Sequence, residues 1–232
     1  MAFHYSPKIV NSGLIFYMDP INTKCYTGTG ATFSNLISPS ISNKILGTSY
    51  NSISKSFDTN ATLDTQSNNI SCDTITFADA SEYTLDFWVK LRSGIGSTAN
   101  SIFGNGTSSR PLVFISCNTG NTWFPRFTSS LNITYDFTGI IDYNLEQNWA
   151  NVTLVFKSNR NIDFYLNGVY KQSIIVVTNT SLIINKIGSS FFGGGLYYPL
   201  QGSISATKIY NKSLSSSEVL QNFNALKSRF GL

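Results

Sequence analysis

The sequence predicts an all-β fold of short antiparallel strands, with one short helix at the C-terminal end. Apolar and polar residues alternate with period two, an Asn-Gly pair separates two such runs, and a helix-capping serine precedes a run with helical spacing. The composition agrees with this prediction. The 232 residues are 41% hydrophobic and only 12% charged, which suits one β-rich core and excludes coiled coils and acidic disordered chains.

The clearest strand covers residues 83–91. Its two faces alternate, with Tyr83, Leu85, Phe87, Val89 and Leu91 on one and Thr84, Asp86, Trp88 and Lys90 on the other. This alternation predicts a strand with one face on a core.

A tight hairpin is predicted further along the chain. Runs 162–166 and 169–174 flank Asn167-Gly168, and 151–157 alternates in the same way just before them. Asn-Gly favours a type I′ turn, because both central residues of that turn need positive φ.

Other strand-like runs are separated by Gly, Asn and Ser clusters at spacings typical of a β-sandwich. They lie at 13–18, 56–63, 111–117, 122–128, 181–187 and 202–210. The predicted helix begins at Ser215, because Ser215 and Glu218 have capping-box spacing. It ends within 227–231, where basic residues and a glycine suit a helix C-terminus.

The domain organisation predicted is an N-terminal arm, residues 1–12, followed by one domain, residues 13–232. We expect neither a membrane-spanning segment nor a signal peptide, since no apolar stretch is long enough. The net charge of +4 is spread thinly, which argues against a nucleic-acid partner. Cys25, Cys72 and Cys117 lack the spacing of a zinc site and are predicted to be free thiols.

Short motifs follow one another in a definite order along residues 13–228. They are GLIFYMDP at 13–20, SFD at 56–58, YTLDFWVK at 83–90, WANVTLVF at 149–156, FYLNG at 164–168, LQGSI at 200–204 and IYNKSLS at 209–215. This order resembles that of concanavalin A-like, laminin G-like jelly-roll domains of the kind found in bacteriophage structural proteins. The resemblance implies a jelly-roll sandwich of two antiparallel sheets with variable edge loops.

The resemblance does not settle function, because this architecture hosts lectins, glycosidases, adhesins and structural modules. A jelly-roll glycosidase commonly carries its carboxylates on one strand as Glu-x-Asp-x-Glu, and that motif is absent. Glu82 and Glu146 lie in loop-like sequence, Glu218 caps the helix, and the only histidine, His4, lies in the predicted arm. We therefore expect the protein not to be an enzyme.

Calcium is the cation that lectin-like members of this family often hold. The loop-edge candidates are Asp58, Asp64, Asp136 and Asp142. They form no dense acidic cluster, and an isolated Asp beside Ser, Thr or Asn usually forms a turn. We therefore predict no metal site and no cofactor.

Sugar binding without a metal would use loop aromatics that stack on pyranose rings beside neutral polar groups. The candidates in Gly- and Asn-rich segments are Trp123, Tyr135, Tyr143, Phe191, Phe192, Tyr197 and Tyr198. The alternative is that these residues pack under loops or between subunits. Residues 191–198 are the most suggestive, because flexible glycines beside four aromatics are costly unless something covers them.

The function predicted is that of a non-enzymatic phage virion structural protein: a capsid decoration, fibre or tail adhesion module. Its expected partners are other virion proteins, further copies of itself and host-surface glycans. Two alternatives stay open. One is a free carbohydrate-binding lectin or adhesin, and the other is a glycoside hydrolase of the same fold that uses Glu82 or Glu146.

Overall fold

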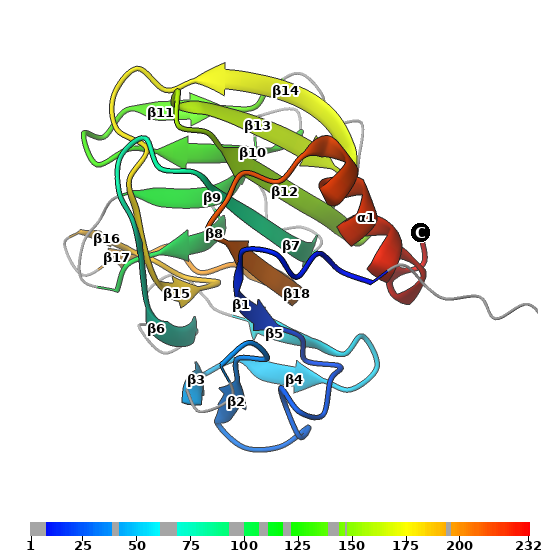
Figure 1. Cartoon of the computed structure of the whole chain (residues 1–232). Coiled ribbons are helices and arrows are strands. Elements are labelled where there is room, and N and C mark those ends of the chain that lie inside the picture. Colours follow the sequence, from blue (N-terminus) through cyan, green and yellow to red (C-terminus); the bar gives the residue numbers. More distant parts are fainter. Residues whose placement is uncertain are drawn as a thin grey trace, which may run out of the picture.

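Two antiparallel sheets pack face to face in this computed structural model (Figure 1). The structure describes residues 8–38, 42–60, 69–92, 100–106, 111–117, 122–138, 144–146, 148–193 and 196–232. Within these ranges each sheet has eight strands, and one short helix follows the last strand. The predicted all-β sandwich with a short C-terminal helix is confirmed.

The first sheet has the strand order β14-β13-β12-β7-β18-β5-β4, and β1 also pairs with β18. Its strands are β1 (Leu14–Met18), β4 (Ser49–Asn51), β5 (Ser56–Asn60), β7 (Tyr83–Leu91), β12 (Ala150–Phe156), β13 (Asn161–Leu166), β14 (Val169–Ile175) and β18 (Gln201–Tyr210). Strand β7 coincides with the run that the alternation predicts. The β13–β14 hairpin is also confirmed, since Asn167 and Gly168 have φ of 51° and 76°.

The second sheet has the order β11-β10-β9-β8-β15-β6-β3-β2. Its strands are β2 (Thr32–Ser34), β3 (Ser42–Leu46), β6 (Asn69–Phe77), β8 (Asn100–Gly104), β9 (Leu112–Cys117), β10 (Trp123–Thr128), β11 (Thr134–Asp136) and β15 (Leu182–Ile187). A small separate hairpin consists of β16 (Phe191–Gly193) and β17 (Leu196–Tyr197). No disulfide joins Cys25, Cys72 and Cys117, all of which lie in the described ranges.

The main core lies between the two sheets. Leu85, Phe87 and Val89 of β7 are fully buried there, in one cluster with Phe103 of β8 and Ile184 of β15. These are the β7 positions that the alternation assigns to a core, so the predicted inward face is confirmed.

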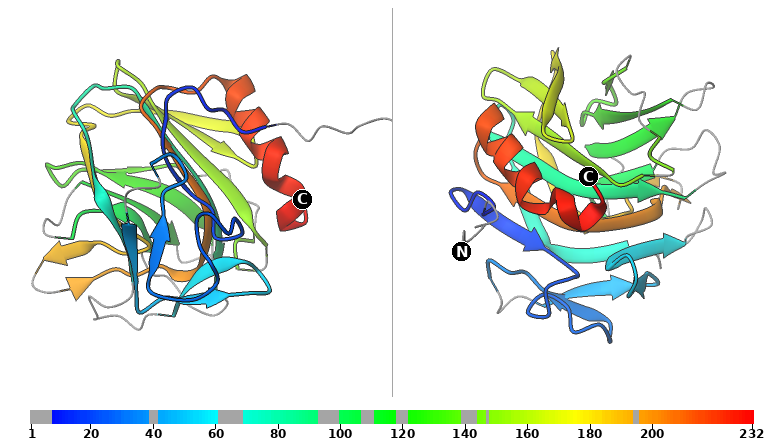
Figure 2. Two further views of the ribbon diagram at one scale, coloured as in Figure 1. Left: turned by 60° about the horizontal axis from the view of Figure 1, so that its bottom comes forward. Right: turned by 90° about the vertical axis from the view of Figure 1, so that its right-hand side faces the viewer.

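A second apolar cluster covers the outer face of the first sheet. Helix α1 (Ser216–Leu226) and a 3₁₀ turn (Lys227–Phe230) lie across this face (Figure 2). Trp88 of β7 stacks on Phe230 at a centroid distance of 4.0 Å. Strand β7 is therefore buried on both faces along most of its length, whereas the alternation predicts burial on one face only.

Residues near both ends of the chain stabilise the packing of α1 on the first sheet. The Ser215–Glu218 capping box that starts α1 is present, as predicted. Val10 is buried under the helix, and its N–H donates to Asn222 Oδ1 at 2.9 Å. Residues 8–12 of the predicted arm thus pack on the domain, and the first seven residues, including His4, lie outside the described ranges. Among the described residues, no helix has the length and apolarity needed to cross a membrane.

Candidate functional site

A break in strand register between β6 and β15 shapes the outer face of the second sheet. Ile184 pairs with Ile75 and Lys186 pairs with Ser71, so residues 72–74 of β6 lie opposite Asn185 alone. Bulges of this kind bend a strand and redirect its side chains, and they are frequent beside functional sites. Here the irregular stretch of β6 borders a hollow of about 420 Å³.

The hollow opens on the outer side of the sheet. Ile70 and Ile187 adjoin Ser71 and Lys186 in the chain and are fully buried in the core, so alternation turns Ser71 and Lys186 outward. We call this site the β6–β15 hollow. Its lining residues are Ser71, Cys72, Asp73, Thr74, Gly106, Asn185 and Lys186.

Lys186 supplies the positive charge of the β6–β15 hollow. Its Nζ donates to Asn69 Oδ1 and to Ser71 Oγ, each at 2.9 Å. An ammonium has three N–H donors, so the contacts among the described residues leave one donor for a ligand. Burial lowers the pKa of Lys186, because a low-dielectric environment disfavours the charged form.

Asn185 is held in place by its own neighbours. Its Oδ1 accepts from Gly106 N at 2.8 Å, and its Nδ2 donates to Asn105 Oδ1 at 3.2 Å. A Cβ at Gly106 would lie 2.9 Å from Lys186 Cε, so glycine leaves the space that the lysine occupies. The amide and the ammonium are therefore fixed before any ligand arrives.

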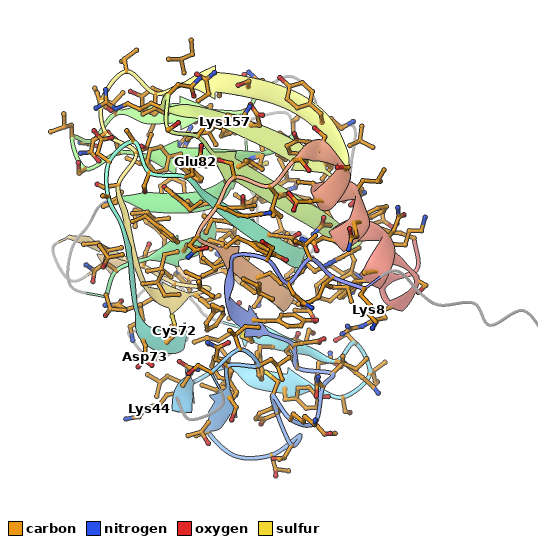
Figure 3. All side chains as sticks on the ribbon, viewed as in Figure 1. Lys8, Lys44, Cys72, Asp73, Glu82 and Lys157 are labelled. Carbon is orange, nitrogen blue, oxygen red and sulfur yellow. The ribbon has the colours of Figure 1, made fainter. Side chains whose placement is uncertain are left out.

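The polar surface continues from the hollow across the next strands. Lys44 of β3 lies opposite Ser71, and Thr32 of β2 lies opposite Lys44; both are exposed. Figure 3 shows Lys44, Cys72 and Asp73 at the same end of the sandwich. The Cys72 thiol stays protonated near neutral pH, because burial raises its pKa to about 12.

A second hollow of about 250 Å³ lies on the first sheet, beside β5, β7 and β18. We call it the charged hollow; it is lined by Asp58, Lys90, Leu91, Arg92, Glu146, Gly202 and Ser203. The Asp58 carboxylate accepts from Asn51 Nδ2 at 2.9 Å and from Ser56 Oγ at 2.8 Å. Two carboxylates from distant segments thus line one depression with two basic residues at the end of β7, an arrangement that no local sequence motif could indicate.

The aromatic residues proposed from the sequence are not gathered at either hollow where the structure describes them. Trp123 is 2% exposed in the core, which leaves its ring no accessible face in this conformation. Tyr135 is half-buried, and its hydroxyl lies 3.0 Å from Thr178 Oγ1. The half-buried Tyr198 donates its N–H to Ser190 O at 3.3 Å.

The remaining aromatic candidates belong to less fully described segments. Phe191 and Phe192 lie on β16 and Tyr197 on β17, where the structure describes the backbone. Tyr143 lies outside the described residues.

The predicted cation ligands are also dispersed. Asp58 lies in the first sheet and Asp136 in the second, where Asp136 is bonded by Arg126 Nε and Nη2 at 2.5 and 2.7 Å. Asp64 and Asp142 lie outside the described ranges. Within those ranges, no three or more His, Cys, Asp or Glu side chains are grouped so that they could hold a metal ion.

Comparison with known protein families gives a clear result. A family model described as the concanavalin A-like lectin/glucanases superfamily matches residues 64–220, more than half of the chain. The chain belongs to this superfamily. No curated protein matches the sequence. The jelly-roll architecture implied by the sequence motifs is confirmed for this member of the concanavalin A-like superfamily.

Solved structures with this fold include toxin binding domains. The binding domain of Paraclostridial mosquitocidal protein 1 is 16% identical with a TM-score of 0.60, over 92% of this chain and 52% of that one. The ligand binding domain of botulinum neurotoxin serotype D, solved with N-acetylneuraminic acid, is 12% identical with a TM-score of 0.65, over 92% and 51%. The chain thus spans about half the length of these domains, and at such identities the likeness shows the fold alone.

About a third of a sialidase chain has this fold as well, which contradicts the sequence-based exclusion of an enzyme. A Trypanosoma rangeli sialidase mutant that displays trans-sialidase activity is 13% identical with a TM-score of 0.63, over 97% of this chain and 34% of that one. The exclusion relied on the absence of a Glu-x-Asp-x-Glu strand, on the positions of the three glutamates and on the lack of a histidine outside the predicted arm. The charged hollow instead collects Asp58 and Glu146 from distant segments.

Proposed function

We propose that this domain binds glycans at the β6–β15 hollow, and that it does so on a bacteriophage particle as a capsid decoration, fibre or tail adhesion module. The observation that carries the binding proposal is the register break between β6 and β15. It lines an open hollow with hydroxyl, amide, carboxylate and ammonium groups on a rigid sheet.

The chemistry of the hollow suits sugars. Each sugar hydroxyl both donates and accepts, so it needs a mixture of donors and acceptors at fixed positions. Thr74 and Asp73 are exposed at the rim, and the bonds of Lys186 to described residues use two of its three donors. The serotype D toxin domain solved with N-acetylneuraminic acid supports a sugar as the ligand class, since it has the same fold.

The proposal of a particle-bound protein rests on the motif order, which resembles that of jelly-roll domains in phage structural proteins. Mass spectrometry of purified particles from the source of this sequence should detect the chain in stoichiometric amounts. Recovery only from the host cytosol, with none in the particles, would contradict the location without affecting the binding proposal.

The binding proposal is tested with a panel of host-envelope glycans and polysaccharides, scored for retention of the protein and for released oligosaccharide, with and without calcium. The informative variant is Thr74→Val, which removes a hydroxyl that lines the hollow. Thr76→Val is its matched control, because Thr76 is exposed two residues further along β6 and does not line the hollow. We expect weaker retention by the Thr74 variant only. Equal retention by both variants and the parent would place the glycan elsewhere.

A free lectin or adhesin is the second candidate. The toxin binding domains that share this fold support it, since one of them is solved with N-acetylneuraminic acid. Saturable glycan binding by the isolated protein, combined with its absence from particles, would select this candidate.

A further inference from the structure

Lys186 is a half-buried cation that the described part of the chain leaves without a counter-charge. Its Nζ donates to Asn69 Oδ1 and to Ser71 Oγ at 2.9 Å each, and both acceptors are neutral. None of the ion pairs among the described residues includes Lys186 or Lys44. Taking an ammonium out of water without a counter-charge is costly, so an anion bound at Lys186 would offset part of that cost.

Two lysines flank Ser71 on the outer face of the second sheet. Ser71 of β6 lies opposite Lys186 of β15 on one side and opposite Lys44 of β3 on the other. Opposed residues of neighbouring strands project from the same face, and two strand spacings separate the lysine Cα atoms by about 10 Å. The exposed Lys44 side chain can therefore reach an anion that lies above Ser71 and contacts Lys186.

The polar groups at this place are mainly donors. Ser71 Oγ accepts from Lys186, so the hydroxyl can donate its own hydrogen to a ligand. The two bonds of Lys186 to described residues leave one of its N–H groups for a ligand, and Lys44 adds a second ammonium. A sugar hydroxyl donates as well as accepts, whereas an ionised carboxylate or sulfate only accepts. Donors gathered around Ser71 thus suit an anion better than a neutral hydroxyl.

We infer that the glycan bound at the β6–β15 hollow is acidic, and that its carboxylate or sulfate group lies above Ser71 between Lys186 and Lys44. The inference rests on the proposed function, which leaves the charge of the glycan open. Hydrogen bonds from an ammonium to an anion are shorter and stronger than neutral ones. Asp73 is the one carboxylate among the lining residues of the hollow, and it is exposed at the rim, where solvent and salt screen its repulsion.

Matched pairs of polysaccharides test the charge of the ligand. Polygalacturonic acid, alginate and polysialic acid are each compared with their carboxyl-reduced forms, and dextran sulfate is compared with dextran. An ionic strength of about 0.15 M limits attraction by the net charge of +4 to distances of about 8 Å. We expect at least one acidic form to retain the protein about tenfold more tightly than its neutral counterpart, as for one charge-assisted hydrogen bond. The pair that shows this difference identifies the anion as a carboxylate or a sulfate.

Three exposed residues test the position of the anion without disturbing the core. Lys44→Gln should weaken retention on the acidic form about threefold, as for an exposed ion pair, and leave the neutral form unchanged. Asp73→Asn removes a like charge and should strengthen retention on the acidic form. Lys8→Gln is the matched control, because Lys8 lies beside α1, which covers the other sheet (Figure 3). Equal effects of Lys8→Gln and Lys44→Gln would show that net charge attracts the polysaccharide, which would refute the inference.

The inference and the proposed function fail in different ways. Equal retention by both members of every pair, weakened in each case by Thr74→Val, would refute an acidic ligand and leave glycan binding at the hollow intact. A preference for acidic forms that neither Lys44→Gln nor Asp73→Asn alters would place the anion elsewhere and overturn the inference. Retention by none of the polysaccharides would refute the proposed function, and the inference with it.

Discussion

Lys208 and Asp86 form an ion pair that is wholly enclosed by the protein. Nζ of Lys208 lies 2.8 Å from Oδ1 of Asp86, and neither side chain is exposed to solvent. The two residues are direct cross-strand partners on β18 and β7. Asp86 also accepts from Asn151 Nδ2 at 2.9 Å and from Asn222 Nδ2 at 3.1 Å. One carboxylate thus joins three strands of the first sheet to helix α1.

Removing the cation from this pair should be strongly destabilising. Lys208→Met keeps most of the side-chain volume and leaves the Asp86 carboxylate buried without its counter-charge. We expect the free energy of unfolding to fall by about 3–5 kcal/mol, the range for breaking one side of a buried ion pair. Urea unfolding followed by tryptophan fluorescence measures this change.

Two further variants separate charge from packing. Adding Asp86→Asn to Lys208→Met removes the uncompensated charge, so part of the lost stability should return. Lys157→Met breaks a pair with Asp163 in which the lysine side chain is 40% exposed, and it should cost no more than about 1 kcal/mol. Equal decreases in the free energy of unfolding for Lys157→Met and Lys208→Met would show that burial of the ion pair does not determine how much stability its loss removes.

Acid should weaken the fold through Asp79. The Arg160 guanidinium, bonded to its carboxylate at 2.5 and 3.1 Å, and the Thr180 N–H hold the pKa of Asp79 well below its usual range. The folded state therefore keeps this group ionised at pH values where the unfolded chain, with a pKa of about 3.9, takes up a proton. The contribution of ionised Asp79 to the free energy of unfolding is complete above about pH 4. It is lost as the pH falls toward the lower pKa of the folded state.

The Asp79 prediction is checked by urea midpoints measured between neutral and acidic pH. The parent protein should lose stability on acidification below about pH 4 more steeply than Asp79→Asn, which cannot titrate. Identical pH profiles would assign the acid sensitivity to other carboxylates.

Strand β7 shows how far the sequence predicts the fold. Its bounds follow from alternation alone, because the face toward the second sheet must be apolar along its whole length. Burial of its other face depends on α1, more than 100 residues further along the chain, and alternation carries no information about such a contact. For that reason the alternation predicts an exposed Asp86, although this residue is fully buried.

The candidate site was missed for a related reason. Strand β6 does not alternate regularly, since residues 72–74 lie at the register break, and no strand is predicted there. The register break that removes the period-two pattern of β6 also shapes the hollow. Its lining uses Ser, Thr and Asn, which are too abundant in this sequence to stand out, whereas the conspicuous Trp123 belongs to the core.

The helix cap offers a local test of stability. The Ser215 hydroxyl accepts from Glu218 N, and Glu218 Oε2 accepts in return from Ser215 N at 2.9 Å. Ser215→Ala should lower the free energy of unfolding by about 1 kcal/mol. Ser228→Ala, at an exposed position on the turn after the helix, should stay within about 0.5 kcal/mol of the parent in the same thermal or urea measurement. If both variants lost the same stability, the cap would not be the cause.

Gly106 allows the β6–β15 hollow to be disturbed without removing any of its polar groups. In Gly106→Ala the new methyl group would lie 2.9 Å from Lys186 Cε, so the flexible lysine must shift from the position in which it bonds Asn69 and Ser71. The backbone at this glycine does not have the positive φ that would strain an alanine. We therefore expect glycan retention to fall about tenfold, as for the loss of one charged hydrogen bond, with a stability change below about 1 kcal/mol.

Retention of the variant and the parent is compared on immobilised glycan, and their stability is compared by urea unfolding. If NMR spectra show that the Lys186 signal has changed while glycan retention has not, the ammonium does not contact the sugar. A lower free energy of unfolding would instead mean that the methyl group disrupts the sheet itself.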